Sequence, residues 1–239
     1  NKREGKTAFL FPGQGSQRIN MARDLFVVFP EMRKLISQYP ELEKVLFPST
    51  TFDADSLKQQ KETIKDTRLA QPLLGIVDLA LAKFLQSLGI VPDMLAGHSY
   101  GELPALCFAG VFDEEQLVEL SSKRAQSILD SVENGDPGTM VAVNANAEQL
   151  KALLNRVEGC YPVNYNSPTQ CVVAGSTLAI GKLMELLKQE RVSAKKLEVA
   201  CAFHSPLVAK SKQLYANVLK DVPFQETRLP VWSNTATRL

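Results

Sequence analysis

The chain has 239 residues and is 45% hydrophobic, enough to bury the core of one large domain or of a domain with a smaller insert. Lys and Arg number 27 and Asp and Glu 26, so the net charge of +1 gives no reason to expect nucleic acid or an anionic membrane as a partner. The longest apolar stretches are short and carry charges, so we expect neither a membrane span nor a leader sequence. We therefore expect a soluble cytoplasmic protein.

The cysteine and histidine content argues against a metal centre. Cys107, Cys160, Cys171 and Cys201 show no C-x-x-C spacing, and the chain has only two histidines. We expect no metal site and reduced, mostly buried thiols. Because residue 1 is Asn rather than Met, we also expect the sequence to be part of a longer polypeptide.

The first half of the chain alternates strand and helix signals. The apolar run TAFLF (residues 7–11) predicts a buried strand that breaks into the glycine turn PGQGSQ. Helical periodicity follows over 21–35, and the polar stretch 39–65 predicts a surface connection with helical pieces. Dense apolar residues predict a buried helix over 69–88, closed by Gly89.

A second strand, DMLAG (93–97), runs directly into the turn G-H-S-Y-G and a helix over about 100–109. Asp113 is placed to cap the N-terminus of the next helix, which should extend to about residue 132.

The character of the sequence changes after ENGDPG. Residues 139–197 read as β-α-β-β-α-β, the pattern of a ferredoxin-like module. We expect this stretch to form a small subdomain inserted into a core made of residues 1–138 and 198–239, with the functional site in a cleft between the two.

Gly97-x-Ser99-x-Gly101 between a strand and a helix is typical of a nucleophile elbow, in which small residues let the chain turn tightly while the serine projects outward. The elbow also exposes the Tyr100 amide as an oxyanion donor. The alternative is a glycine-rich helix start in which Ser99 is only a capping residue.

A serine nucleophile needs a base, and the two candidates are His98 and His204. His98 adjoins Ser99, so its side chain should leave the turn in another direction. His204, in the loop ACAFHSPLV, is therefore the predicted base, although an isolated histidine is more often structural.

The first glycine loop raises the question of a phosphate site. PGQGSQ does not complete G-x-G-x-x-G, because Arg18 takes the place of the third glycine. Gln14, flanked by glycines at a strand end, instead suits a second backbone donor to an oxyanion.

Five blocks occur in order: FLFPGQGSQ, GHSYGE, LVELSSKRAQSI, NYNSPTQCVVAG and CAFHSPLV. Together they resemble the malonyl-CoA:acyl carrier protein transacylase family and the acyltransferase domains of fatty-acid, polyketide and polyunsaturated-fatty-acid synthases. The resemblance implies a hydrolase-like α/β core with a nucleophile elbow and a ferredoxin-like insert. It implies Ser99 as nucleophile, His204 as base, and the backbone amides of Gln14 and Tyr100 as oxyanion hole.

The same resemblance implies that Arg124 binds the free carboxylate of a malonyl group. Phe203 matches the AFH signature of malonyl-selective domains, and Gln71 in AQPLL matches another block near the site. The resemblance also implies a further block well beyond the strand PVWSN (230–234), which helps to orient the histidine through a backbone acceptor. Because the sequence stops at Leu239, we expect that this part either belongs to another fragment or is absent.

The expected activity is a ping-pong transfer of malonyl from malonyl-CoA to the phosphopantetheine thiol of an acyl carrier protein, without a resident cofactor or metal. Other domains of a synthase are further expected partners. One alternative is a serine hydrolase or thioesterase, with Asp113 or Asp136 as the acid. Another is a non-catalytic docking scaffold.

Overall fold

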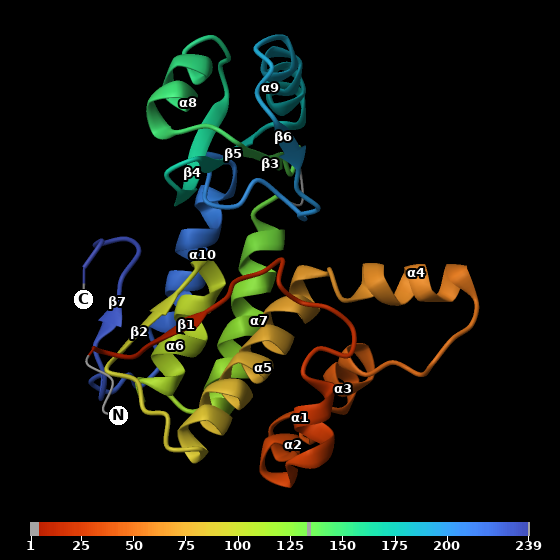
Figure 1. Cartoon of the computed structure of the whole chain (residues 1–239), viewed down its shortest axis with the longest axis vertical. Helices are drawn as coiled ribbons and strands as arrows, with labels where there is room; N and C mark the ends of the chain where they lie inside the picture. Colours follow the sequence, from red (N-terminus) through yellow and green to blue (C-terminus); the bar gives the residue numbers. More distant parts are fainter. Residues whose placement is uncertain (1–4, 133–134, 239) are drawn as a thin grey trace. The chain divides into compact units, whose positions relative to one another are not determined.

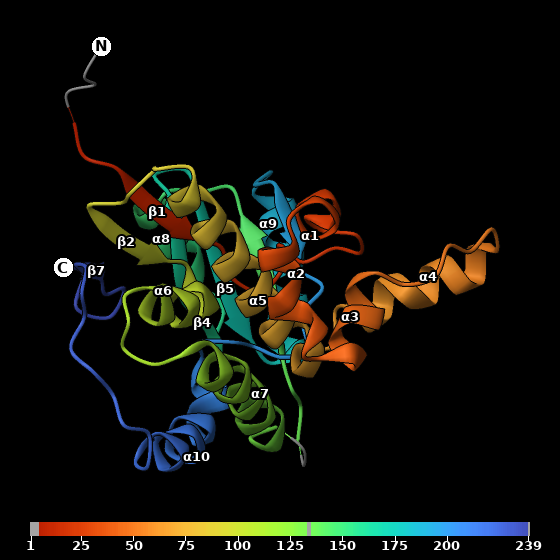
Figure 2. The same cartoon turned by 90° about the horizontal axis from the view of Figure 1, so that it is seen from below.

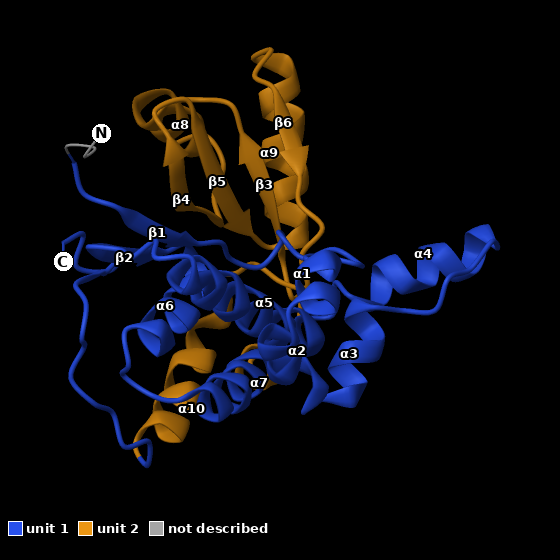
Figure 3. Cartoon of the chain, turned by 60° about the horizontal axis from the view of Figure 1, so that its bottom comes forward, with its two compact units in different colours: residues 1–125, 221–239 blue, residues 126–220 orange. Residues whose placement is uncertain are grey.

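The computed structural model describes residues 5–132 and 135–238. The chain forms two compact units, residues 1–125 with 221–239 and residues 126–220 (Figure 3). The second unit is larger than the predicted insert 139–197, because it also takes in neighbouring residues on both sides. The predicted boundaries of the core, 1–138 and 198–239, stay a prediction; residues 1–4, 133, 134 and 239, which include part of ENGDPG, lie outside the described residues.

The first unit contains a parallel sheet of three strands in the order β1-β2-β7 (Figure 1). These strands are β1 (Ala8–Phe11), β2 (Met94–Gly97) and β7 (Val231–Trp232). Phe9 and Phe11 of β1 turn to one face, where their rings lie 5.8 and 6.1 Å from that of Phe108. The central strand is β2, so the residues that follow it emerge in the middle of the sheet edge.

Four short helices lie between β1 and the long central helix of the first unit. They are α1 (Arg23–Val28), α2 (Pro30–Ser37), α3 (Pro40–Leu46) and α4 (Ala54–Thr63). The periodicity over 21–35 is divided, because Phe29 is extended (φ −111°, ψ 100°) and Pro30 begins a new helix. Helix α4 projects away from the rest of its unit in both views (Figures 1 and 2) and has no buried residue.

Helix α5 (Thr67–Ser87) is the buried helix predicted over 69–88. Gly89 follows the C-cap residue Leu88, and its φ of 81° is in the left-handed region that glycine adopts without strain. By length and composition α5 could cross a membrane, but 67% of its most apolar window is buried within the structure. The apolar residues are thus accounted for by core packing, as in the central helix of a globular protein.

The second unit contains the predicted β-α-β-β-α-β sequence. Its elements are β3 (Thr139–Val143), α8 (Ala147–Leu154), β4 (Cys160–Ser167), β5 (Gln170–Gly175), α9 (Thr177–Gln189) and β6 (Ala194–Lys196). The four strands form a separate antiparallel sheet in the order β4-β5-β3-β6. The expectation of an α/β fold with a second, ferredoxin-like antiparallel sheet is confirmed.

Alternation along the strands assigns the two faces of this antiparallel sheet. Val141, Val143 and Val173 pack in one cluster with buried leucines of α8 and α9, so both helices cover the same face. Met140 and Val172 point to the opposite face, where they pack with Ala202 and other residues that follow β6. The period of two therefore buries both faces of the sheet.

Asp78 is a buried carboxyl in the middle of α5. It is only 4% exposed, and its Oδ2 has no hydrogen-bond partner in the described part of the chain. Burial raises the pKa of Asp78 from 3.8 to about 8. Between these values the native chain holds a proton that the unfolded chain has lost, so stability falls as pH rises from about 4 to about 8.

Replacing Asp78 by Asn removes this titration while keeping the side-chain shape. We expect Asp78→Asn to raise the melting temperature at pH 8, by about 2 to 4 °C for each kcal/mol gained, and to lose that advantage toward pH 5. Thermal denaturation across this range measures the difference. Asp55→Asn, on the exposed face of α4, is the control; a pH-independent effect of Asp78→Asn would contradict the buried neutral carboxyl.

Candidate active site

The predicted nucleophile lies on a sharp turn after the central strand β2. Ser99 begins the 3-10 turn η1 (Ser99–Gly101), which leads into α6 (Glu102–Phe108). Its φ is 53°, a left-handed conformation that is costly for a residue with a Cβ. A Cβ on Gly97 would lie 2.1 Å from the Glu102 nitrogen, so the turn requires glycine there. This geometry is that of a nucleophile elbow.

The loop after β1 packs directly on this elbow. The His98 amide donates to the Phe11 carbonyl at 2.9 Å, and a Cβ on Gly101 would lie 2.1 Å from that same oxygen. A Cβ on Gly13 would lie 2.3 Å from the His98 carbonyl oxygen and 3.3 Å from its Nδ1. The two glycine loops singled out in the sequence are therefore neighbours, and Gln14 follows immediately at their contact.

Gln14 and Gln71 meet through their side chains. Gln71 Nε2 donates to Gln14 Oε1 at 3.1 Å, and Gln14 Nε2 donates to Thr67 Oγ1 at 3.0 Å. Gln71 is 1% exposed, and its own Oε1 has no partner among the described residues. The side-chain amide of Gln14 is therefore engaged in hydrogen bonds, and the Gln14 backbone is the part of the residue open to other roles.

Arg124 lies on α7 (Glu114–Asp130) beside the residue that follows the serine. The centre of its guanidinium is 5.9 Å from the ring centroid of Tyr100, within the range of a cation–π interaction. Within the first unit the structure thus brings Arg124 next to the elbow, and the same unit holds Gln14 and Gln71.

Two residues without a predicted role, Asn234 and Glu102, also form hydrogen bonds at the elbow. Asn234, after β7, donates through Nδ2 to the Gly97 carbonyl at 2.6 Å. Its backbone amide donates to Glu102 Oε1 at 2.9 Å, across 132 residues of sequence. These two bonds connect Asn234 to residues before and after Ser99. The only sequence signal is the PVWSN strand itself, which does not specify its partner.

His204 and Phe203 belong to the second unit. His204 is exposed and, like Ser99, is a non-glycine residue with a positive φ, 61°. The next residue, Ser205, is buried and donates to the Ala202 carbonyl at 2.6 Å, while the short helix η2 (Pro206–Val208) and α10 (Ala209–Leu219) follow. Phe203 packs against two apolar clusters of its unit, those of Met140 and Ile128.

The two carboxylates considered for a hydrolase triad both accept hydrogen bonds from other residues. Asp113 Oδ1 accepts from the Gln116 amide at 2.8 Å, which confirms its predicted role as helix cap. Asp136 accepts from the Gly138 amide and from the Thr177 amide and hydroxyl. These bonds lower the pKa of Asp136, with the Thr177 hydroxyl as the main cause. Both side chains are thus engaged in structural hydrogen bonds.

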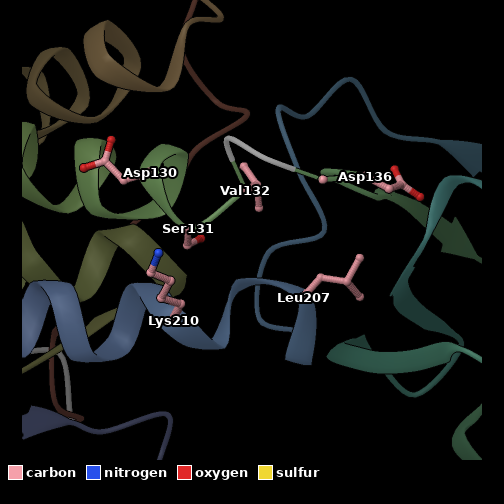
Figure 4. A pocket seen from close by; sticks show the side chains of 7 residues that line it. Asp130, Ser131, Val132, Asp136, Leu207 and Lys210 are labelled. Atoms are coloured by element: carbon pink, nitrogen blue, oxygen red, sulfur yellow. The ribbon is translucent and has the colours of Figure 1, made fainter.

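Two pockets, one in each unit, lie away from the predicted nucleophile, base and arginine. One, of about 250 Å³, is in the second unit between Asp130, Asp136, Leu207 and Lys210 (Figure 4). Another, of about 530 Å³, is in the first unit and is lined in part by Phe108, at the end of α6 away from Ser99. Neither contains Ser99, His204 or Arg124.

The cysteines are free thiols, and three of the four are buried. Burial raises the pKa of Cys107 to about 12 and that of Cys160 to about 11, so neither is a thiolate at neutral pH. In the part of the chain that the structure describes, no group of three His, Cys, Asp or Glu side chains is placed to hold a metal ion.

Comparison with known proteins gives one consistent result. The malonyl CoA-acyl carrier protein transacylase of Bacillus subtilis is 32% identical over 97% of this chain and 73% of its own length. The acyltransferase domain of the second module of the salinomycin polyketide synthase superposes with a TM-score of 0.85 at 29% identity, over 99% of this chain and 55% of that one. A malonyl-transacylase solved with a type II polyketide acyl-carrier protein gives 0.84 at 30% identity, over 98% and 76%.

A parallel sheet with a nucleophile elbow, together with a ferredoxin-like antiparallel sheet, defines the class as an α/β acyltransferase. The family model described as acyl transferase domain matches residues 8–239. The chain belongs to this acyl transferase domain family.

The bond from Asn234 to Gly97 predicts an order of stability among substitutions. Asn234→Ala should cost about 1 to 3 kcal/mol, because the Gly97 carbonyl loses its donor. Asn234→Asp should cost more, since it places a carboxylate oxygen against that carbonyl. Urea denaturation of the three proteins measures both effects. An Asp variant as stable as the Ala variant would contradict this contact.

Proposed function

We propose that the chain transfers a malonyl group from malonyl-CoA to the phosphopantetheine thiol of an acyl carrier protein, through an acyl-Ser99 intermediate. The observation that carries the proposal is the Arg124 guanidinium, held 5.9 Å from the ring of the residue next to Ser99. A cation at this place suits an acyl group with a free carboxylate. Relatives named as malonyl CoA-acyl carrier protein transacylases support the same reaction.

In the first half-reaction His204 takes the proton of the Ser99 hydroxyl, and the oxygen attacks the thioester carbonyl of malonyl-CoA. The negative charge on the carbonyl oxygen is stabilised by the amides of Gln14 and Tyr100. The carbon–sulfur bond then breaks, and His204 returns the proton to the leaving thiolate of CoA. Packing of the Gln14 loop on the elbow supports the assignment of the two amides.

The second half-reaction runs the same steps with a different thiol. His204 deprotonates the phosphopantetheine thiol, which attacks malonyl-Ser99, and the proton finally returns to the Ser99 oxygen. The mechanism requires His204 of the second unit to reach Ser99. The positive φ of both residues supports a functional role, since strained backbone tends to cluster at active sites. No metal or resident cofactor takes part, and we place the reaction in the cytoplasm.

Three further residues are assigned to substrate selection. Arg124 forms a bidentate pair with the malonyl carboxylate. Phe203 limits the space for a methyl branch on the acyl group, and Gln71 orients Gln14 through their hydrogen bond. Other domains of a larger synthase are proposed partners, as in the polyketide synthase module that contains the salinomycin acyltransferase domain.

Transfer is distinguished from hydrolysis by the fate of the acyl-enzyme. We expect mass spectrometry to find malonyl on Ser99 after incubation with malonyl-CoA, and none in Ser99→Ala. Addition of a phosphopantetheinylated carrier protein should remove the malonyl group far faster than water does. His204→Ala should slow loading by several powers of ten. Rapid release to water would favour the thioesterase alternative, and absence of loading would favour a docking scaffold.

Selectivity depends on the Arg124 charge. Arg124→Ala removes one partner of a largely desolvated ion pair, which should cost malonyl loading about 3 to 5 kcal/mol, or roughly two to four powers of ten. Acetyl-CoA has no carboxylate and should lose little, so the preference between the two acyl groups reverses. Loading rates of Ser99 with each substrate measure this. Equal losses would mean that Arg124 only supports the fold.

A further inference from the structure

The side chain of Tyr100 is held rigidly at its tip. Tyr100 is 1% exposed, and its phenolic oxygen lies 2.6 Å from Oγ of Ser121 on α7. Ser121 Oγ in turn donates to the Leu117 carbonyl at 2.6 Å. A serine hydroxyl has a single proton, so with that proton given to Leu117 the Tyr100 hydroxyl is the donor to Ser121. The phenol is therefore anchored by a directed pair of hydrogen bonds.

Helix α5 forms the other wall of the slot that contains this phenol. A Cβ built on Gly75 would lie 2.5 Å from the phenolic oxygen and 3.3 Å from Cγ of Leu117. Any larger residue at position 75 would displace the ring. Gly75 on one helix and Ser121 on another thus leave space for a tyrosine of one orientation, while its backbone is set by the elbow.

The anchored ring in turn supports Arg124. Ser121 and Arg124 are three residues apart on α7, so they lie on the same face of that helix. The guanidinium lies 5.9 Å from the Tyr100 ring centroid. A long arginine side chain otherwise loses much conformational freedom when it binds a ligand, and contact with a fixed aromatic face reduces that loss.

We propose that the Tyr100 side chain, anchored by Ser121 in the slot opposite Gly75, is a specificity-determining positioning residue that orients Arg124 toward the acyl group on Ser99. The inference rests on the proposed function. Tyr100 then acts twice: its backbone amide faces the oxyanion, and its ring sets the cation that distinguishes malonyl from acetyl. One residue couples the two ends of the bound acyl group.

The test compares single-turnover loading of Ser99 by malonyl-CoA and acetyl-CoA within each variant, so that changes in Ser99 reactivity cancel in the ratio. Tyr100→Leu should lower the malonyl-to-acetyl ratio roughly 3- to 30-fold, the range expected for loss of a cation–π contact. Ser121→Ala should lower it in the same direction by a smaller factor. Ser122→Ala is the matched control, because Ser122 makes the equivalent hydroxyl bond to the Val118 carbonyl and should leave the ratio unchanged.

A double-mutant comparison separates positioning from a merely structural role. In an Arg124→Ala background, Tyr100→Leu should cause no further change in the ratio, because its effect passes through the arginine. Tyr100→Leu and Ser121→Ala with wild-type ratios, while Arg124→Ala alone reverses the preference, would overturn this inference and leave the proposed function standing. An unchanged ratio in Arg124→Ala would overturn the malonyl assignment of Arg124 and this inference with it.

Discussion

The close backbone approach around Ser99 is the constraint on which the rest of the first unit depends. Gly97, Gly101 and Gly13 each lie where a Cβ would come within 2.3 Å or less of a backbone atom. No side chain can be accommodated at such separations without moving the main chain. The residues at the ends of β1 and β2 are therefore in contact through backbone atoms. Only this contact places the Gln14 loop next to Ser99.

The strain at Ser99 is maintained by bonds that surround it on several sides. The Phe11 carbonyl accepts from the His98 amide, and Asn234 donates both to the Gly97 carbonyl and to the Glu102 carboxylate. Each bond satisfies a backbone or side-chain group that the tight turn would otherwise leave without a partner. A left-handed serine persists because the neighbouring structure determines its conformation more strongly than its own preference does.

The second unit is built differently, because its framework is a regular antiparallel sheet and not a strained turn. Strand alternation covers one face with α8 and α9 and turns the other toward the segment after β6. His204 lies in this segment with a positive φ, and the next residue, Ser205, is buried and donates to the Ala202 carbonyl. The predicted nucleophile Ser99 and the predicted base His204 thus both have a left-handed backbone conformation within otherwise regular structure.

Local patterns in the sequence were sufficient for most of the elements and for the elbow. Strand alternation and helical periodicity over 139–197 predicted β-α-β-β-α-β, and the glycine spacing around Ser99 predicted the turn. The break between α1 and α2 was missed, although Pro30 marks it. These signals are readable because backbone sterics and side-chain period act between residues close in sequence.

Only the tertiary structure decided which distant side chains meet. Gly75 and Ser121 form the slot for Tyr100 from two separate helices, and Asn234 reaches Gly97 from 137 residues away. No sequence pattern predicts which residue each of these contacts, because glycine, serine and asparagine occur in many turns and caps. Their roles arise from helix packing and strand order, which bring together atoms that no local rule relates.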